Sequence, residues 1–496
     1  MFVFFCKKLY LLQNFKKHIM KFRKLLFLLL GTTLYSYAQP ADAVLYQLLL
    51  NANNTNTIAL DNTGNAITID NGDGIITAAE AQQVYALNLK HTYGNRIVRL
   101  DDLQIFTNLN VLDLYDNNIS SIAPIHQLPI KELDLGFNRA LELQVLDLTA
   151  LTNLQKISAV AIGLNGITVN NLTNLTFIDV SYNFITNIDI TSNPNLEQLF
   201  LNYNTVNAIS YNSPNSLKIL HAEKNNLSTS FFVNMTNLED LVLSENQYST
   251  LDVTSLNNLK KLTCDYNQIT SLNLGALNQI TNLSCANNQL TNLSLTNLVT
   301  LEDLRCSNNL LTTLDVLESP LLNTLICSYN SLTTLDLSNA SLLSSLACNN
   351  NNLSSLYLKN NGPSLNGEGF SFNNNPNINY ICEDASEINF INDFLIQYGY
   401  TGVTVTSNCT LGTTAVTTKP ANYTLSPNPT DGILNLAYSD NTENIISISV
   451  FNTLGQEVLY TQSNFKKIDL SSLISGNYIV KITTKVGVLT SKIIKH

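Results

Sequence analysis

An asparagine that recurs every 21 residues constrains the fold of this chain more than any other feature. Starting at Asn183, asparagine occupies nine positions at this interval, the last being Asn351. The aligned units form twelve consecutive copies, from LNVLDLYDNNI (109–119) to LSSLACNNNNL (343–353), of the pattern L-x-x-L-x-L-x-x-N-x-L. A unit this short cannot bury its apolar face alone, so neighbouring units must stack. The sequence therefore predicts a mostly β solenoid of about twelve 21-residue coils with short parallel strands.

Each part of the unit has a structural reason. The fourth and sixth residues alternate on a short strand and point into the coil, where stacked neighbours bury them. The asparagine turns the chain inward, and its amide can bond backbone groups that the bend leaves unpaired. One copy (154–164) carries Ile162 in place of asparagine and follows its predecessor at a spacing of 24 residues, so we expect a distorted coil there.

Cysteine takes the sixth position in five consecutive units, at Cys264, Cys285, Cys306, Cys327 and Cys348. Because leucine takes this position in other copies, we predict buried free thiols that act as small apolar groups. A metal site is disfavoured, since one column of a parallel ladder cannot surround an ion tetrahedrally. Disulfides between adjacent coils are the open alternative, because a strand spacing of ~4.8 Å lies within the usual range of Cα separations.

The N-terminus is typical of an export signal. From Met20, which we interpret as the true start, basic residues (Lys21, Arg23, Lys24) precede a short apolar run and a predicted cut after Ala38. We assign residues 1–38 to a leader and signal peptide. Removing them changes the formal charge from −11 to 19 − 37 = −18, which argues against nucleic acid as a partner. No later stretch approaches the ~20 apolar residues of a spanning helix, so no transmembrane segment is expected after signal cleavage.

Residues 39–100 are predicted to form an N-terminal cap that begins with a helix in PADAVLYQLLLN (40–51). The stretch IDNGDGIITAAEA (69–81) resembles an EF-hand or dockerin-type calcium loop, where oxygen ligands at alternating positions hold a hard cation. The resemblance implies a structural Ca²⁺ on Asp70, Asn71, Asp73 and Glu80, although Asp70 stands one place late. The alternative is a degenerate loop held by Asx-turns. No other cofactor is expected.

Residues 101–409 are assigned to the repeats and a C-terminal cap. Cys382 and Cys409 flank the last irregular stretch, and an exported protein reaches an oxidising compartment, so we expect a disulfide between them. The threonine-rich segment 410–422 is predicted to be a linker. Residues 423–496 show alternating strands separated by turn residues, which is consistent with a small C-terminal β-sandwich.

Four motifs occur in order within this last segment: SPNPTDG (426–432), VFNTLGQEV (450–458), IDLSSLISGNY (468–478) and the basic end SKIIKH. Residues 423–496 therefore resemble the type A C-terminal sorting domain (Por type) of Bacteroidetes type IX secretion cargo. The resemblance implies a partner in the type IX secretion machinery and a location outside the outer membrane, either attached to the cell surface or released. Residues 40–409 resemble extracellular bacterial leucine-rich repeat proteins of the internalin-like kind, which implies adhesion or ligand binding.

The sequence shows no H-E-x-x-H or G-x-S-x-G motif, and its carboxylates lie on repeat positions, so we predict no enzymatic activity. The fifth, seventh and eighth positions of each unit should form the concave surface, where solenoids usually bind. The candidate ligand-binding residues there are Asp113, Tyr115, Asp134, Phe137, Asp179, Tyr182, Phe200, Tyr203, Glu223 and Tyr266.

These observations favour a secreted or cell-surface binding protein. The leading hypothesis is an adhesin that recognises protein or glycan through its concave face, where aromatic groups among acidic ones could contact sugars or a basic protein surface. One alternative is a structural cell-envelope or matrix protein without a discrete ligand. A further alternative is a protein that captures carbohydrate for a neighbouring enzyme.

Overall fold

The computed structural model describes residues 40–92, 94–141, 144–212, 216–363, 369–409, 423–438, 445–452, 456–484 and 487–496. The predicted leader and signal (1–38) and the predicted linker (410–422) lie outside the described residues. The chain divides into two compact units, one ending at Ser407 and the other running from Asn408 to His496. Among the described residues, no helix combines the length and apolar character needed to cross a membrane.

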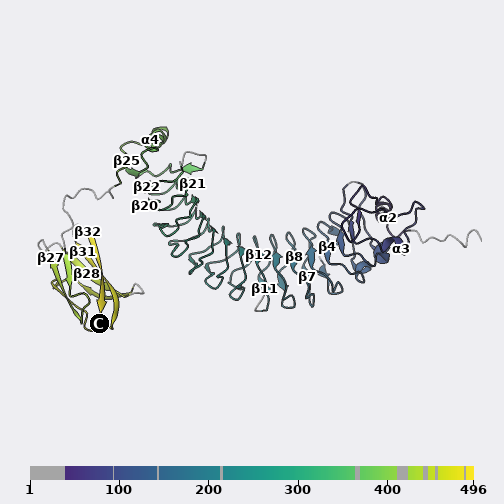
Figure 1. The fold of residues 1–496 in the computed structure, drawn as a ribbon, viewed down its shortest axis with the longest axis horizontal. Coiled ribbons are helices and arrows are strands. Elements are labelled where there is room, and N and C mark those ends of the chain that lie inside the picture. Colours follow the sequence, from purple (N-terminus) through teal and green to yellow (C-terminus); the bar gives the residue numbers. More distant parts are fainter. Residues whose placement is uncertain are drawn as a thin grey trace, which may run out of the picture. The chain divides into compact units, whose positions relative to one another are not determined.

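The first unit is a solenoid built on one sheet of fifteen short strands within the described residues. Apart from β1, which is antiparallel to β2, neighbouring strands run parallel and in register. Figure 1 shows this sheet along the inner, concave side of the curved stack of coils. The strands are β1 (Ala59–Leu60), β2 (Ala86–Asn88), β3 (Val111–Asp113), β4 (Glu132–Asp134), β6 (Lys156–Ser158), β8 (Phe177–Asp179), β10 (Gln198–Phe200), β12 (Ile219–His221), β13 (Asp240–Val242), β15 (Lys261–Thr263), β17 (Asn282–Ser284), β18 (Asp303–Arg305), β19 (Thr324–Ile326), β21 (Ser345–Ala347) and β23 (Phe370–Ser371).

The return side of the coils carries shorter parallel sheets of two to four strands. Short 3-10 helices connect some of the early coils, namely η1 (Asp101–Ile105), η2 (Ala123–Ile125) and η3 (Arg139–Leu141). This architecture confirms the predicted solenoid, and β2 and β23 lengthen it beyond the twelve units that the pattern marks. The return strands are β5 (Val145–Asp147) with β7 (Gly166–Thr168), β9 (Asn187–Asp189) with β11 (Ala208–Ser210), β14 (Thr250–Asp252) with β16 (Ser271–Asn273), and β20 (Thr334–Asp336), β22 (Ser355–Tyr357), β24 (Tyr380–Cys382) and β25 (Thr404–Thr406).

The recurring asparagine binds adjacent coils together through its side chain. Asn204 is representative: its amide nitrogen donates to the carbonyl oxygens of Val180 (2.9 Å) in the preceding coil and Leu201 (3.0 Å) in its own. Its amide oxygen accepts from the Ile185 N–H at 3.0 Å. One buried side chain therefore satisfies backbone groups on two coils, as the pattern predicts.

The coil that lacks asparagine keeps its strand. β6 pairs in register with both β4 and β8, so the distortion predicted from Ile162 and the 24-residue spacing does not reach the strand of this coil. The physical reason lies in the next coil, where the amide oxygen of Asn183 accepts from the N–H groups of Ile162, Gly163 and Leu164 at 2.9–3.2 Å. The neighbouring asparagine thus holds this turn.

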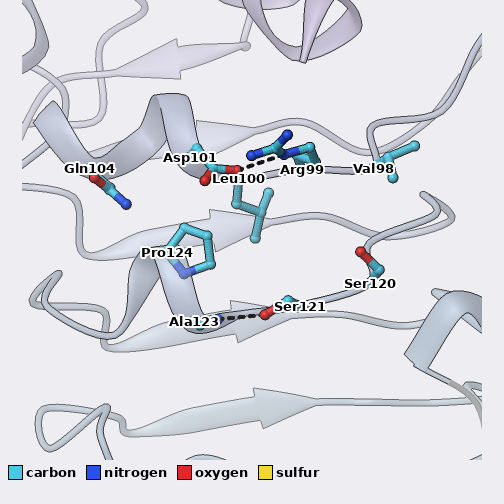
Figure 2. Close-up of a pocket in the computed structure, with 9 residues that line it drawn as sticks. All are labelled: Val98, Arg99, Leu100, Asp101, Gln104, Ser120, Ser121, Ala123 and Pro124. Atoms are coloured by element: carbon cyan, nitrogen blue, oxygen red, sulfur yellow. Dashed lines mark hydrogen bonds and ion pairs between the residues drawn. The ribbon is translucent and has the colours of Figure 1, made fainter. Parts of the chain in front are cut away.

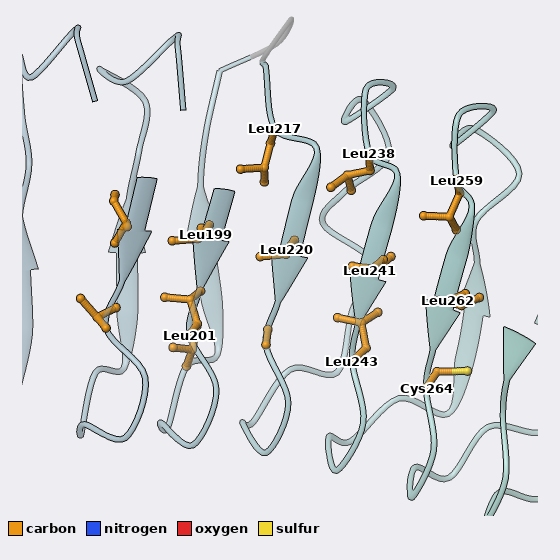
Figure 3. Close-up of a cluster of buried hydrophobic side chains, with 14 of the residues drawn as sticks. Leu199, Leu201, Leu217, Leu220, Leu238, Leu241, Leu243, Leu259, Leu262 and Cys264 are labelled. Carbon is orange, nitrogen blue, oxygen red and sulfur yellow. The ribbon is translucent and has the colours of Figure 1, made fainter. Parts of the chain in front are cut away.

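Leucine and cysteine columns fill the centre of the solenoid. Figure 3 shows Cys264 just after the end of its strand, at the place that Leu243 occupies in the neighbouring coil. All five cysteines of the column are buried and free, which confirms the prediction of buried thiols and excludes disulfides between coils. Burial raises the pKa of each thiol, for Cys348 to about 12, so the column stays uncharged.

Caps close both ends of the stack. At the start, helix α2 (Ala43–Leu50) begins at Asp42, whose carboxylate accepts from Val44 and Leu45 of the helix and from Val98 and Arg99 of the first coils. Burial alone would raise the pKa of Asp42, but these four N–H donors hold it below its ordinary value. The carboxylate therefore fixes the helix to the solenoid.

At the other end, helix α4 (Ile388–Gln397) packs its aromatic side chains against the last coil. The rings of Phe372 and Phe394 stack with centroids 4.3 Å apart, and Phe370 contacts Phe394 at 5.5 Å. Cys382 and Cys409 are disulfide-bonded in this region. The aromatic layer covers apolar surface that the final coil would otherwise expose.

The second unit is an antiparallel β-sandwich with its own core. One sheet has the order β26-β27-β30 and the other β29-β28-β31-β32, and a single buried cluster that includes Leu434, Val450 and Val480 joins them. This confirms the predicted C-terminal sandwich. The strands are β26 (Tyr423–Ser426), β27 (Ile433–Tyr438), β28 (Ile445–Phe451), β29 (Glu457–Thr461), β30 (Lys467–Asp469), β31 (Gly476–Thr484) and β32 (Gly487–Lys495).

Candidate ligand-binding face

The concave face consists of the outward side chains of the long sheet and of the turns that follow each strand. In each three-residue strand the middle side chain enters the core, so the first and third side chains point outward together. Four of the predicted binding residues, Asp113, Asp134, Asp179 and Phe200, are the last residues of their strands. The other six lie two or three residues further on: Tyr115, Phe137, Tyr182, Tyr203, Glu223 and Tyr266.

The structure brings two pairs of these residues into ring contact. Tyr182 and Tyr203 stack with centroids 4.4 Å apart, and Tyr115 meets Phe137 at 5.1 Å. Gly136 makes room for the second pair, since a Cβ atom there would lie 2.9 Å from the Tyr115 ring. Tyr266 stands three coils beyond Tyr203 and is 62% exposed.

The aromatic residues that precede the asparagine occupy an unusual backbone conformation. Phe137, Tyr182, Tyr203 and Tyr266 have φ angles between 54° and 62°, in the left-handed region. Three of the last four units of the pattern fill the same position with asparagine, at Asn287, Asn308 and Asn350, and asparagine adopts this region more readily than aromatic residues do. The aromatic choices in the earlier coils are therefore not explained by backbone preference.

Three of the predicted acidic residues, Asp113, Asp134 and Asp179, occupy the same position on β3, β4 and β8, with Ser158 of β6 between the last two. Burial raises the pKa of Asp134 above its ordinary value, and the neighbouring carboxylates of Asp113 and Asp179 add to the effect. The backbone N–H of Gly136 donates to Asp134 at 2.8 Å and partly offsets the shift. These carboxylates are therefore close enough for Asp113 and Asp179 to disfavour the charged form of Asp134.

The predicted residue Phe200 belongs to an aromatic cluster at the centre of this face, which we call the aromatic shelf: Phe177, Phe200 and His221. Phe177 and His221 were not predicted. The rings of Phe177 and Phe200 lie 5.5 Å apart, and Phe200 meets His221 edge-on at 5.0 Å. All three side chains are partly exposed. Phe177 occupies the third position of its unit, which shares its outward side with the fifth, so the two-residue periodicity of a strand was the signal that could have found it.

The shelf borders a depression of about 440 Å³, which we call the concave pocket. Four charged side chains line it: Asp240 and Lys261 on β13 and β15, and Asp303 and Arg305 on β18. His221, Val242, Thr263, Asn282 and Ser284 complete its outward-facing lining. None of these residues was predicted. Asp240, Lys261, Asn282 and Asp303 occupy the third position of the unit, which was left out of the predicted surface. The others occupy the fifth position, which was included, but no feature of the sequence distinguished them from the same position in other coils.

Another depression, of about 520 Å³, lies near the start of the solenoid and is drawn in Figure 2. It is lined by η1 and η2 together with Arg99, Ser120 and Ser121. The two charged residues that line it form an ion pair with each other, since the guanidinium Nε of Arg99 lies 3.1 Å from the Asp101 carboxylate. This cavity lacks the aromatic surface that accompanies the concave pocket.

The predicted calcium ligands lie in a loop that is held by its own hydrogen bonds. Asp70 accepts from the Gly74 N–H (3.1 Å), and Asp73 accepts from the Ile75 N–H (2.9 Å). Asn71 accepts from the Asp73 N–H at 3.2 Å, while Glu80 accepts from Thr77 and caps the short helix α3 (Ala78–Ala81). The hydrogen bonds of Asn71 and Asp73 are the Asx-turns of the alternative interpretation, and calcium binding by this loop stays a prediction.

Converging carboxylates occur elsewhere among the described residues. Oxygen atoms of Glu383, Asp384 and Glu387 lie within 4.8 Å of one another at the C-terminal cap. Burial raises the pKa of Glu383 to about 8, and the nearby Glu387 contributes in the same direction. A protonated Glu383 relieves the repulsion between these groups.

Comparison with known proteins supports export and a leucine-rich repeat fold. Residues 424–496 match the family described as a secretion system C-terminal sorting domain. The chain is therefore cargo of the type IX secretion pathway, delivered to the outer cell surface or released beyond it. No curated protein matches the chain significantly in sequence.

Solved structures resemble the chain in fold. The functional domain of InlJ from Listeria monocytogenes, described as including a cysteine ladder, aligns with a TM-score of 0.52 at 18% identity, covering 91% of this chain and 98% of that one. An internalin, InlF from the same organism, aligns at 20% identity with a TM-score of 0.38, covering 74% and 88% of the two chains. The leucine-rich repeat domain of APL1B aligns at 19% identity with a TM-score of 0.45, covering 63% and 84%.

Proposed function

We propose that this exported leucine-rich repeat protein is an adhesin that holds a protein or glycan partner on its concave face. We further propose that it acts by binding and not by catalysis. The sorting domain delivers the chain to the outside of the cell, where such a face meets ligands. The predicted residues Asp113, Tyr115, Asp134, Phe137, Asp179, Tyr182, Phe200, Tyr203, Glu223 and Tyr266 would surround the contact.

The observation that carries this proposal is the aromatic shelf. Partly exposed aromatic side chains at the centre of a surface, surrounded by polar groups, are typical of positions that dominate binding energy. Phe177, Phe200 and His221 lie on three adjacent strands and contact one another across the coils. They point away from the core, so packing of the solenoid does not require them.

The test is binding of the full chain to whole cells, using the substitution Phe200→Ala. We expect saturable binding that weakens at least about tenfold in the variant, because truncation of a central aromatic residue commonly costs more than ~1.4 kcal/mol. Phe184→Ala is the matched control, since Phe184 is 53% exposed and lies outside the shelf. Absence of binding by folded protein would instead favour a structural envelope role.

A further inference from the structure

The concave pocket has a charge pattern that restricts its ligand. Along the first outward position of successive strands, Asp240, Lys261 and Asp303 alternate in sign, with Asn282 between the last two. Arg305 adds a second cation, so the formal charges of the two carboxylates and two cations cancel. Asp240 and Asp303 would repel a polyanion, and Lys261 and Arg305 would repel a polycation.

Two of the four charged groups in the pocket are already fixed to each other. Arg305 donates to Asp303 through both Nε (3.0 Å) and a terminal guanidinium nitrogen (3.0 Å). His221 Nε2 lies 3.3 Å from Asp240, but it makes no hydrogen bond within the described residues. Lys261, by contrast, makes no ion pair with any described residue. The pocket thus offers oriented donors and acceptors without net charge.

Small polar groups separate the charged ones. Thr263 and Ser284 hydroxyls and the Asn282 amide line the middle of the depression. Ser284 is itself oriented, because its hydroxyl donates to Asp265 at 2.8 Å. A hydroxyl both donates and accepts hydrogen bonds, so a ligand rich in neutral hydroxyl groups complements carboxylates, cations and hydroxyls alike.

We infer that the concave pocket binds a neutral oligosaccharide, with one sugar in the pocket and the neighbouring part of the chain across the aromatic shelf. His221 belongs to both features, which makes them one continuous surface. An aromatic ring offers an apolar face to the C–H side of a sugar, while the polar groups of the pocket take its hydroxyls. This inference rests on the proposed function and specifies the class of ligand.

The experiment measures binding of the full chain to an array of neutral, anionic and amino-sugar oligosaccharides, and in parallel to whole cells. The key variant is Thr263→Phe, which fills the pocket. Phe200 occupies the same column of the sheet as Thr263, three coils earlier, so the fold accommodates phenylalanine in this column. Ala347→Phe is the matched control, because Ala347 lies in the same column but outside the pocket.

We expect neutral oligosaccharides to bind and Thr263→Phe to weaken them at least about tenfold, while Ala347→Phe leaves them unchanged. Binding should vary little between about 0.05 and 0.5 M NaCl, since the ligand carries no charge to screen. Lys261→Met provides a second variant in case Thr263→Phe does not fold, because Lys261 is exposed and makes no ion pair with a described residue. It should also weaken binding, by loss of a donor.

Other outcomes would overturn the inference in distinguishable ways. Selective binding of anionic or amino sugars would refute the neutral class. Binding to cells that Thr263→Phe abolishes, without any binding to oligosaccharides, would identify a protein partner and leave the proposed function intact. Oligosaccharide binding that resists both Thr263→Phe and Lys261→Met would place the ligand outside the pocket.

Discussion

At the scale of single residues, the core contains a polar group that its surroundings do not satisfy. Tyr248 is fully buried at a position where other coils carry leucine or isoleucine, such as Leu227 and Ile269. Its hydroxyl finds no hydrogen-bond partner among the described residues. Burial raises the pKa of this hydroxyl, which therefore stays neutral. An unpaired buried hydroxyl destabilises the folded state.

We expect Tyr248→Phe to stabilise the solenoid by about 1 kcal/mol, because it removes the unpaired hydroxyl and keeps the ring. Thermal and urea unfolding of the two proteins measure the difference. Tyr248→Leu is a useful comparison, since it removes the hydroxyl but also shrinks the side chain, and should lose stability through the cavity it leaves. A lower unfolding temperature for Tyr248→Phe would show that the hydroxyl has a partner after all.

Residues whose role repeats could be predicted from the sequence, and residues whose role is local could not. The asparagine and cysteine columns are visible because each coil imposes the same geometry on them. The pocket residues Lys261 and Arg305 vary from coil to coil, so no period marks them. The left-handed backbone at Tyr182 was also missed, because tyrosine does not signal that conformation as glycine or asparagine does.

At the scale of elements, the C-terminal cap contains a titrating group that links its stability to pH. The Asp384 N–H donates to buried Glu383 at 2.8 Å, and burial is the main reason that the pKa of Glu383 rises to about 8. The unfolded chain releases this proton at a pKa of ~4.3, whereas the folded chain retains it to a much higher pH. The contribution to stability is therefore complete at low pH and declines as the pH rises from about 4 to about 8.

We expect Glu383→Gln to remove part of the pH dependence of unfolding over this range. Glutamine keeps the size of the side chain and an acceptor oxygen, but it does not ionise. The difference in unfolding temperature between the two proteins, measured from pH 5 to about pH 9, should shift in favour of the variant as pH rises. Parallel curves for wild type and variant would show that Glu383 is ionised throughout.

The calcium loop is an element in which the sequence pattern and the described geometry disagree. The spacing of Asp70, Asn71, Asp73 and Glu80 predicts oxygen ligands, yet backbone N–H groups occupy those oxygens and Glu80 caps α3. Asp70 also stands one place later than the first ligand of the calcium-loop pattern. We therefore expect calcium and EDTA to leave the unfolding temperature unchanged. A calcium-dependent rise that Asp73→Ala abolishes would establish the site.

At the scale of the whole solenoid, adjacent coils are held to one another by the same asparagines that shape each turn. Asn288 donates to the carbonyl oxygens of Cys264 and Cys285, at 3.0 and 3.1 Å, and these two cysteines belong to neighbouring coils. Opening one coil therefore breaks bonds that fix the next. In a stack where each unit contacts only its neighbours, such shared bonds determine how far unfolding spreads.

The reactivity of the five buried thiols can measure how strongly the unfolding of one coil is coupled to that of its neighbours. We expect a thiol reagent to leave Cys264, Cys285, Cys306, Cys327 and Cys348 unmodified in the native protein lacking residues 1–38, since burial removes access and raises the pKa of each thiol. Gln268→Cys, at an exposed position, should react at once and serves as the control for reagent activity.

With increasing urea, the five native thiols should become reactive together, because each asparagine spans two coils and no rung of the column can open without its neighbours. Mass spectrometry of the labelled peptides distinguishes the rungs. Modification that begins at Cys348, next to the C-terminal cap, and proceeds toward Cys264 at higher urea would show that the coils unfold one after another. In that case the caps, and not the shared asparagine bonds, would set the stability of the stack.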